Sequence, residues 1–251
     1  MGALKQSQTR IITGLVLVAV VLMVGYIDNF FLMWLALGAV YLIAFKEAQK
    51  LFEVKNHATQ FYAIVIWLLA GIYPYGDDLF VLAGVGYGAA VAYNSELEWR
   101  DFLPFIYPTA GMLFILSMYD AYGVISLLWL LVIVSMTDIG AYAVGKSIGK
   151  TKFSETSPNK TMEGVVGGIV VATASATFVG LSIVDFWIAF IISFMVSVTS
   201  IFGDLFESSL KRSAGVKDSG NILPGHGGML DRIDGYLFGA IVMLILMRGL
   251  V

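Results

Sequence analysis

The sequence contains no cysteine, two histidines and five prolines, and only 13% of its 251 residues are charged. The absence of cysteine excludes disulfides, thiolate metal ligands and cysteine nucleophiles. Soluble domains contain about 25% charged residues, so the low charge excludes an ordinary soluble domain. What the chain has instead is 59% hydrophobic residues and a mean hydropathy of +0.85. We therefore expect an integral membrane protein, and no nucleic-acid partner.

Nine apolar segments are candidates for helices that span a bilayer, for which about 20 residues are needed. They lie near residues 10–27, 29–45, 59–75, 78–94, 103–119, 122–145, 163–182, 184–207 and 230–250. No small-residue cleavage site follows the first segment, so we expect a retained helix rather than a removed signal. The prediction is an all-α, polytopic membrane protein with about nine transmembrane helices.

Lysine and arginine are confined to alternate loops of this nine-helix arrangement. Fourteen of the 15 lie in the N-terminus and after the second, fourth, sixth and eighth helices, and only Arg248 lies elsewhere. The fourteen are Lys5, Arg10, Lys46, Lys50, Lys55, Arg100, Lys146, Lys150, Lys152, Lys160, Lys211, Arg212, Lys217 and Arg232. Because cytoplasmic loops collect lysine and arginine, we expect a cytoplasmic N-terminus and an external C-terminus.

The end of the eighth predicted helix carries polar residues on one face. Asp204, Glu207, Ser208 and Lys211 are spaced three, four and seven residues apart, so they share a helical surface. A carboxylate at membrane depth is costly unless it is paired, bound to a cation or exposed to a water-filled cavity. The functional interpretation is a cation or substrate site. The structural alternative is an ion pair of Asp204 with Lys211 or Arg232.

The loop that follows, up to the ninth helix, is the densest polar stretch of the chain. Its glycines allow backbone N–H groups to converge on an anion, and the N-terminus of the next helix favours negative charge. Asp231 and Asp234 lie in the first turn of that helix, where acids also serve as simple caps. His226 is either a phosphate donor or an ordinary loop residue. The mixture of cations, glycines and carboxylates suits a substrate with several phosphates and a divalent metal.

Two further polar groups lie before the seventh helix or at its start. Asp138 and Tyr142 lie on one face at the end of the sixth helix, where the neighbouring glycines alternatively indicate close helix packing. Ser157 and Glu163 precede the seventh helix and alternatively are start signals for it. We divide the chain into a scaffold, residues 1–130, and a catalytic region, residues 131–251.

Together these groups indicate displacement at the phosphorus of a nucleotide, with the acceptor arriving from the bilayer. Carboxylates from different helices hold Mg²⁺ through oxygen and leave positions for phosphate oxygens. Lysine and arginine then neutralise the charge that builds during phosphoryl-type transfer.

The segment Ser208–Asp234 resembles the motif of the CDP-diacylglycerol synthase (phosphatidate cytidylyltransferase) family. That motif reads Ser-x-apolar-Lys-Arg, four residues, Lys-Asp-x-small, two residues, apolar-Pro-x-His-Gly-Gly-apolar-x-Asp-Arg-apolar-Asp, and every fixed position is filled. Residues 138–150 and 157–164 resemble the family too, although Asn159 stands where a lysine is common. The first 130 residues match only in being apolar.

The resemblance implies a homodimeric enzyme of the bacterial cytoplasmic membrane that converts CTP and phosphatidic acid to CDP-diacylglycerol and pyrophosphate. It implies Mg²⁺ as cofactor, with room for a second cation such as K⁺. By position, Asp204 and Asp231 would be metal ligands and, with Lys211, Arg212 and Lys217, the catalytic residues. The substrate-binding set would be Asp138, Tyr142, Lys152, Ser157, Lys160, Thr161, Glu163, Ser208, Asp218, His226, Gly227, Gly228, Arg232 and Asp234.

Two other functions fit parts of the pattern. A CTP-dependent lipid-alcohol kinase would also need a metal and nucleotide contacts at the membrane. A transporter could couple ions to the intramembrane Asp138 and Asp204. The products distinguish the first alternative, and transport without nucleotide turnover would identify the second.

Overall fold

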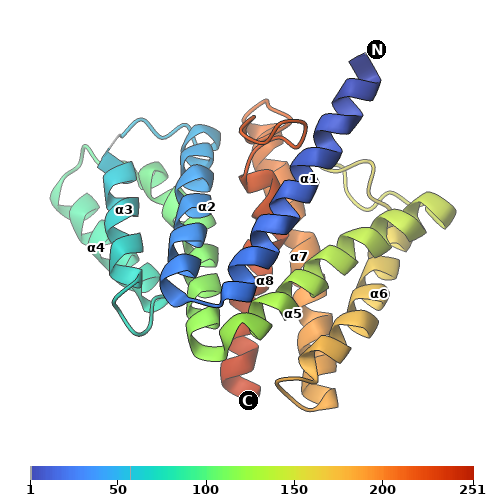
Figure 1. Cartoon of the computed structure of the whole chain (residues 1–251). Coiled ribbons are helices and arrows are strands. Elements are labelled where there is room, and N and C mark those ends of the chain that lie inside the picture. Colours follow the sequence, from blue (N-terminus) through green and yellow to red (C-terminus); the bar gives the residue numbers. More distant parts are fainter. Residues whose placement is uncertain (1, 57) are drawn as a thin grey trace. The chain divides into compact units, whose positions relative to one another are not determined.

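The computed structural model describes residues 2–56 and 58–251, with side chains from residue 11 onward. In these ranges the chain is helical and has no β-strand, only isolated bridges at Lys152–Thr161 and Leu223–Gly227. The helices, labelled in Figure 1, are α1 (Gly2–Ile27), α2 (Phe30–Leu51), α3 (Ala58–Ala70), α4 (Asp78–Tyr93), the short turns η1 (Trp99–Phe102) and η2 (Phe105–Thr109), α5 (Ala110–Ile148), α6 (Met162–Gly180), α7 (Phe186–Ser213) and α8 (Leu230–Leu250). The predicted all-α membrane fold is confirmed at this level.

Five helical segments within the described residues are long and apolar enough to cross a membrane. They are Phe30–Leu51, Trp99–Ile148, Met162–Gly180, Phe186–Ser213 and Leu230–Leu250. Three shorter apolar helices, Ile11–Ile27, Ala58–Ala70 and Asp78–Tyr93, have 10–17 residues. Nine spans and the orientation of the two termini therefore stay predictions. Lys5 and Arg10, which the orientation prediction counts, lie outside the described side chains.

The helix ends differ from the predicted ones where polar residues continue or interrupt a helix. α2 runs to Leu51 rather than residue 45, because Lys46–Lys50 contains strong helix formers that hydropathy alone does not register. α3 ends at Ala70 rather than residue 75, shortly before Pro74. α5 begins at Ala110, inside the fifth predicted segment, and continues through the sixth; it is broken at Gly123, whose φ of 72° is not helical.

The chain forms two compact units, the first comprising Met1–Leu116 and Ser213–Ile233. In this unit α2 and α3 lie side by side (Figure 1), and the indole nitrogens of Trp34 and Trp67 each donate to the other residue's carbonyl, at 3.0 and 3.2 Å. The buried Tyr41 packs against the Trp67 ring and hydrogen-bonds Thr109 at 3.0 Å. This aromatic core fixes α2 within its unit.

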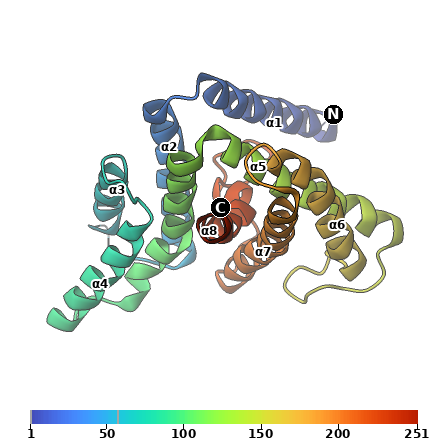
Figure 2. The same ribbon diagram turned by 90° about the horizontal axis from the view of Figure 1, so that it is seen from below.

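The second unit comprises Ser117–Arg212 and Asp234–Val251. Figures 1 and 2 show α7 between α6 and α8. Small residues set the helix spacing: a Cβ at Gly168 of α6 would lie 2.5 Å from the Thr137 carbonyl oxygen of α5. Likewise, a Cβ at Gly203 of α7 would lie 2.6 Å from the Asp234 carbonyl oxygen of α8. The packing alternative concerned the glycines at the end of the sixth predicted helix, and a Cβ at one of them, Gly140, would lie 2.9 Å from the Val171 Cβ of α6.

The two units do not follow the predicted division at residue 130. That division concerned where the chemistry lies rather than which residues are compact, and it stays a prediction. The loop of the family-like motif falls mostly in the first unit, whereas α7 and most of α8 fall in the second.

Candidate functional site

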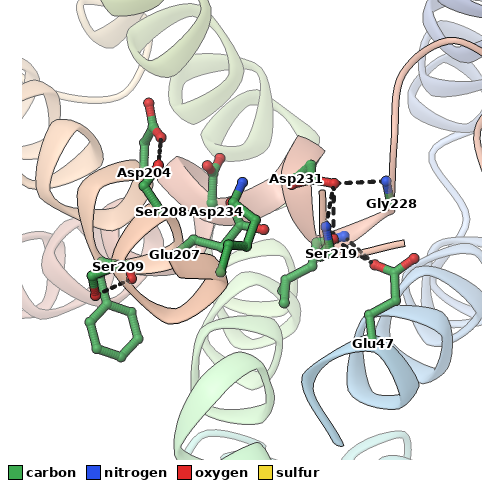
Figure 3. Close-up of polar contacts among 12 residues, drawn as sticks. Glu47, Asp204, Glu207, Ser208, Ser209, Ser219, Gly228, Asp231 and Asp234 are labelled. Carbon is green, nitrogen blue, oxygen red and sulfur yellow. Dashed lines mark hydrogen bonds and ion pairs between the residues drawn. The ribbon is translucent and has the colours of Figure 1, made fainter. Parts of the chain in front are cut away.

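The polar face of α7 is ordered by contacts between successive turns (Figure 3). The Ser208 hydroxyl donates to Oδ1 of Asp204 at 3.3 Å, and the Lys211 ammonium is paired with Oε2 of Glu207 at 2.6 Å. Both pairs have the predicted four-residue spacing. The Glu207 side chain is fully buried and that of Lys211 is 11% exposed. This buried pair explains how α7 carries ionised groups among apolar neighbours.

Asp204 is also paired outside its own helix. The Lys160 ammonium forms an ion pair with Oδ2 of Asp204, and both side chains are partly buried. An ion pair was the structural alternative for Asp204, and here its partner is Lys160, while Lys211 pairs with Glu207. Lys160 therefore provides a cation beside this partly exposed carboxylate.

The start of α6 is capped differently from the sequence-based alternative. The N-cap residue is Thr161, whose hydroxyl accepts from the Gly164 N–H at 3.1 Å, rather than Ser157. The Glu163 carboxylate instead holds the preceding loop: it accepts from the backbone N–H groups of Lys150 and Thr151, at 3.1 and 3.2 Å. These contacts order the segment that carries Lys160.

Asp234 of α8 faces the α7 cluster in Figure 3. Its Oδ1 accepts from the Gly235 N–H at 2.8 Å, and its charge interacts electrostatically with Asp204, Asp138 and Lys211. Two other predicted acidic residues of the second unit, Asp204 and Asp138, thus lie within electrostatic reach of Asp234. Carboxylates grouped in this way, next to cationic side chains, are suited to binding a metal ion, or phosphates that are held by such an ion.

The carboxylate of Asp231 organises the loop of the first unit. Its Oδ2 accepts three hydrogen bonds, from the N–H and hydroxyl of Ser219 at 2.9 and 3.0 Å and from the Gly228 N–H at 2.8 Å (Figure 3). Asp231 lies in the first turn of α8 and accepts from the Gly228 N–H, two residues before the helix begins at Leu230, so it holds the segment that enters the helix. The bonds also fix the direction of the carboxylate.

The glycines of this loop are required by its geometry. Gly227 has a φ of +82°, and a Cβ there would lie 2.8 Å from Oδ2 of Asp231. A Cβ at Gly228 would overlap the Ser219 hydroxyl. The imidazole of His226 lies against Gly14, and its buried Nδ1 has no hydrogen-bond partner among the described residues.

Sequence reasoning missed Glu47, which is part of this arrangement. It lies on α2, is 5% exposed, and accepts from Ser219, Met229 and Leu230. The available signal was its helical spacing: three residues after the buried Ala44 and four before the buried Leu51, Glu47 occupies the core-facing side of α2.

The other predicted residues are at the surface of their own units. Tyr142 is exposed, and its hydroxyl accepts from Lys146 at 3.4 Å. The exposed predicted residues further include Asp138, Lys152, Arg212, Lys217, Asp218 and Arg232. Of these cations, Lys217 lies in the loop that Asp231 orders, where an exposed positive charge attracts a phosphate from solution.

The described part of the chain holds no group of three or more His, Asp or Glu side chains close enough to form a metal centre by themselves. The chemistry of the donors nevertheless suits Mg²⁺, because Asp204 and Asp231 offer carboxylate oxygen and each is held by hydrogen bonds from neighbours. Metal binding stays a prediction.

Comparison with known proteins gives a consistent match over nearly the whole chain. The profile of the cytidylyltransferase family matches residues 8–250. The phosphatidate cytidylyltransferase of Helicobacter pylori strain J99 is 40% identical over 247 residues, covering 97% of this chain and 93% of the relative. That of Brucella suis biovar 1 is 33% identical over 267 residues, covering 95% of each. The Bacillus subtilis strain 168 protein of the same name is 50% identical over 123 residues, 47% of this chain and 46% of the relative.

Proposed function

The chain belongs to the cytidylyltransferase family of enzymes, and we propose that it is a phosphatidate cytidylyltransferase of phospholipid biosynthesis. Its substrates are then CTP and phosphatidic acid, and its products CDP-diacylglycerol and pyrophosphate. The observation that carries the proposal is the match to relatives of that name over almost the full length of both chains. The apolar helices agree with a lipid substrate, and the bacterial relatives favour the cytoplasmic membrane. The proposed cytosolic side of the site rests on the distribution of lysine and arginine along the sequence.

The reaction we propose is one displacement at the α-phosphorus of CTP. A phosphate oxygen of phosphatidic acid forms a bond to that phosphorus, the bond to the β-phosphate oxygen breaks, and pyrophosphate leaves with the electron pair. The attacking phosphate is already anionic, so no strong base is needed. The main barrier is the approach of two anions, which cationic side chains and a metal lower.

The named residues have separate proposed roles. The side chains that neutralise phosphates of the nucleotide and the lipid are those of Lys211, Arg212, Lys217 and Arg232. Lys160 joins them when its ion pair with Asp204 opens. Asp204 and Asp231 are the proposed oxygen ligands of Mg²⁺. When bound, Mg²⁺ supplies positive charge to the phosphate oxygens and orients them. Binding of a second cation such as K⁺ and assembly into a homodimer are proposals that rest on the family resemblance alone.

The alternatives differ in their products. Purified protein with Mg²⁺, CTP and phosphatidic acid should release pyrophosphate and form CDP-lipid in equal amounts, and only when both substrates are present. Release of CDP would indicate a lipid kinase instead. Movement of an ion or solute across proteoliposomes without nucleotide turnover would indicate a transporter.

Asp231→Asn tests the assignment of this carboxylate. The variant should remain folded and lose nearly all activity, since the amide keeps one oxygen but loses the charge. Full activity would remove Asp231 from the proposed metal ligands.

A further inference from the structure

Glu47 is a buried carboxylate of α2 with no role in the proposed reaction. It is 5% exposed, and its two oxygens accept from separate donors. Oε1 accepts from the Met229 N–H at 3.1 Å, and Oε2 accepts from the Leu230 N–H at 2.8 Å and from the Ser219 hydroxyl at 3.2 Å. Such bonds offset the cost of removing a charged carboxylate from water, so the three donors stabilise Glu47 in its buried position.

All three donors belong to the loop that carries the family-like motif or to the helix that begins there. Met229 and Leu230 provide N–H groups at the start of α8, whose positive end stabilises a negative charge. Ser219 lies within the loop between α7 and α8. Glu47 therefore connects the interior of the loop and the start of α8 to α2, within one compact unit.

Ser219 links Glu47 to the proposed metal ligand. Its hydroxyl lies 3.2 Å from Oε2 of Glu47 and 3.0 Å from Oδ2 of Asp231 (Figure 3). The Ser219 hydroxyl has one proton, so it donates to only one of the two carboxylates at a time. The backbone N–H of Ser219 stays bonded to Asp231. The position of Asp231 thus depends on where Glu47 holds this serine.

Two glycines, Gly220 and Gly228, lie close to the Glu47 carboxylate. A Cβ at Gly220 would overlap Oε1 of Glu47, and one at Gly228 would lie 2.7 Å from Oε2. Two backbone segments therefore approach the Glu47 carboxylate directly.

We propose that Glu47 is a positioning residue for catalysis: through Ser219 and the first N–H groups of α8 it fixes the loop so that the Asp231 carboxylate is oriented for its ligand. Its effect on catalysis rests on the proposed function, whereas its effect on the loop does not.

The test compares Glu47→Gln, Glu47→Asp and a matched control, Glu53→Gln. Glutamine keeps one acceptor oxygen but presents an amide N–H₂ to a donor, whereas aspartate keeps both oxygens on a shorter arm. Glu53 is also near the end of α2, but its side chain is 71% exposed and paired with Arg100. The same loss of charge there should have little effect.

Two measurements are made on the full-length protein in detergent. Hydrogen exchange should be about tenfold faster or more in the peptide covering residues 219–231 of Glu47→Gln, as expected for the loss of a charged hydrogen bond. The concentration of Mg²⁺ that gives half-maximal pyrophosphate release should rise about tenfold or more, with the folded fraction unchanged. Glu47→Asp should recover part of both effects, and Glu53→Gln should match the natural protein.

Three results would overturn the proposal. One is unchanged exchange in the loop of Glu47→Gln. Another is faster exchange there with unchanged Mg²⁺ dependence, which would leave Glu47 a purely structural role. The third is equal effects in Glu53→Gln. If the natural protein itself makes no pyrophosphate from CTP and phosphatidic acid, the proposed function fails, and the exchange measurement still decides whether Glu47 holds the loop.

Discussion

Lys160 and Asp204 form an ion pair that joins the residue before the N-cap of α6 to the polar face of α7. Both side chains keep about a quarter of their surface exposed, at 25% and 29%. The pair gives the carboxylate a cation when no substrate is bound. When a metal and a nucleotide bind together, the metal would bind Asp204 and a phosphate would bind Lys160, so that the ion pair is replaced. This exchange is a hypothesis that single substitutions can test.

Lys160→Ala should lower kcat/KM for CTP by about 10- to 100-fold, because a charged contact to phosphate contributes about 1.5–3 kcal/mol. Thermal stability should change little, since the pair is partly exposed to solvent. Steady-state kinetics and a melting curve in detergent measure both. Lys55→Ala, at an exposed lysine beyond α2, is the control. Unchanged kinetics in Lys160→Ala would exclude the proposed exchange.

Asp204→Asn should reduce kcat by about 100-fold or more, which corresponds to about 3 kcal/mol of lost transition-state stabilisation. The amide keeps an oxygen donor but loses the negative charge that strengthens the binding of a divalent cation. Pyrophosphate release measures the effect, with Asp120→Asn, at an exposed carboxylate, as the control. Activity within a few-fold of the natural protein would show that Asp204 is not a ligand.

Lys211→Met should destabilise the protein by about 3–5 kcal/mol, because it leaves the Glu207 carboxylate buried without the cation 2.6 Å away. Adding Glu207→Gln should restore most of the stability but none of the activity, since Lys211 is proposed to bind phosphate. Melting curves and pyrophosphate release distinguish the two roles. Recovery of activity in the double variant would mean that Lys211 serves only the ion pair.

Gly168→Ala should destabilise the protein by about 1–3 kcal/mol, because the added Cβ would lie 2.5 Å from the Thr137 carbonyl oxygen on the facing helix. Gly86→Ala is the matched control: no atom lies within 4 Å of its added Cβ, and alanine favours helix by up to about 1 kcal/mol. Melting temperatures of the two variants should therefore shift in opposite directions. An undiminished melting temperature in Gly168→Ala would contradict the close packing of α5 and α6.

Much of the helical arrangement could be predicted because apolar length is a strong signal in a membrane protein. The break at Gly123 lies near the boundary between the two segments predicted there, and hydropathy alone does not indicate that both segments belong to α5. Helix ends were less predictable. α2 continues through Lys46–Lys50 because these residues favour a helix although most of them are polar. A hydropathy criterion instead ends the segment at the first charged residue.

The candidate site was predictable where a local motif carried it. The spacing of Asp204, Glu207, Ser208 and Lys211 predicted that they share one face of α7, but the expected partner of Asp204 was Lys211 or Arg232, whereas Lys211 pairs with Glu207. The partners from other segments were not predictable: Lys160 reaches Asp204 from the start of α6, and Glu47 reaches Ser219 from α2. A single sequence gives the spacing within an element but not which elements meet. Glu47, which follows Lys46 at the end of an apolar segment, could not be distinguished from an ordinary charge at the membrane edge.

The central claim, transfer of a cytidylyl group to a lipid phosphate, is tested most directly by following two labels in CTP, one at the α-phosphorus and one at the γ-phosphorus. With purified protein, Mg²⁺ and phosphatidic acid, the α label should enter the lipid and the γ label should be released as pyrophosphate. Entry of the γ label into the lipid, or retention of both labels in CTP, would contradict the account.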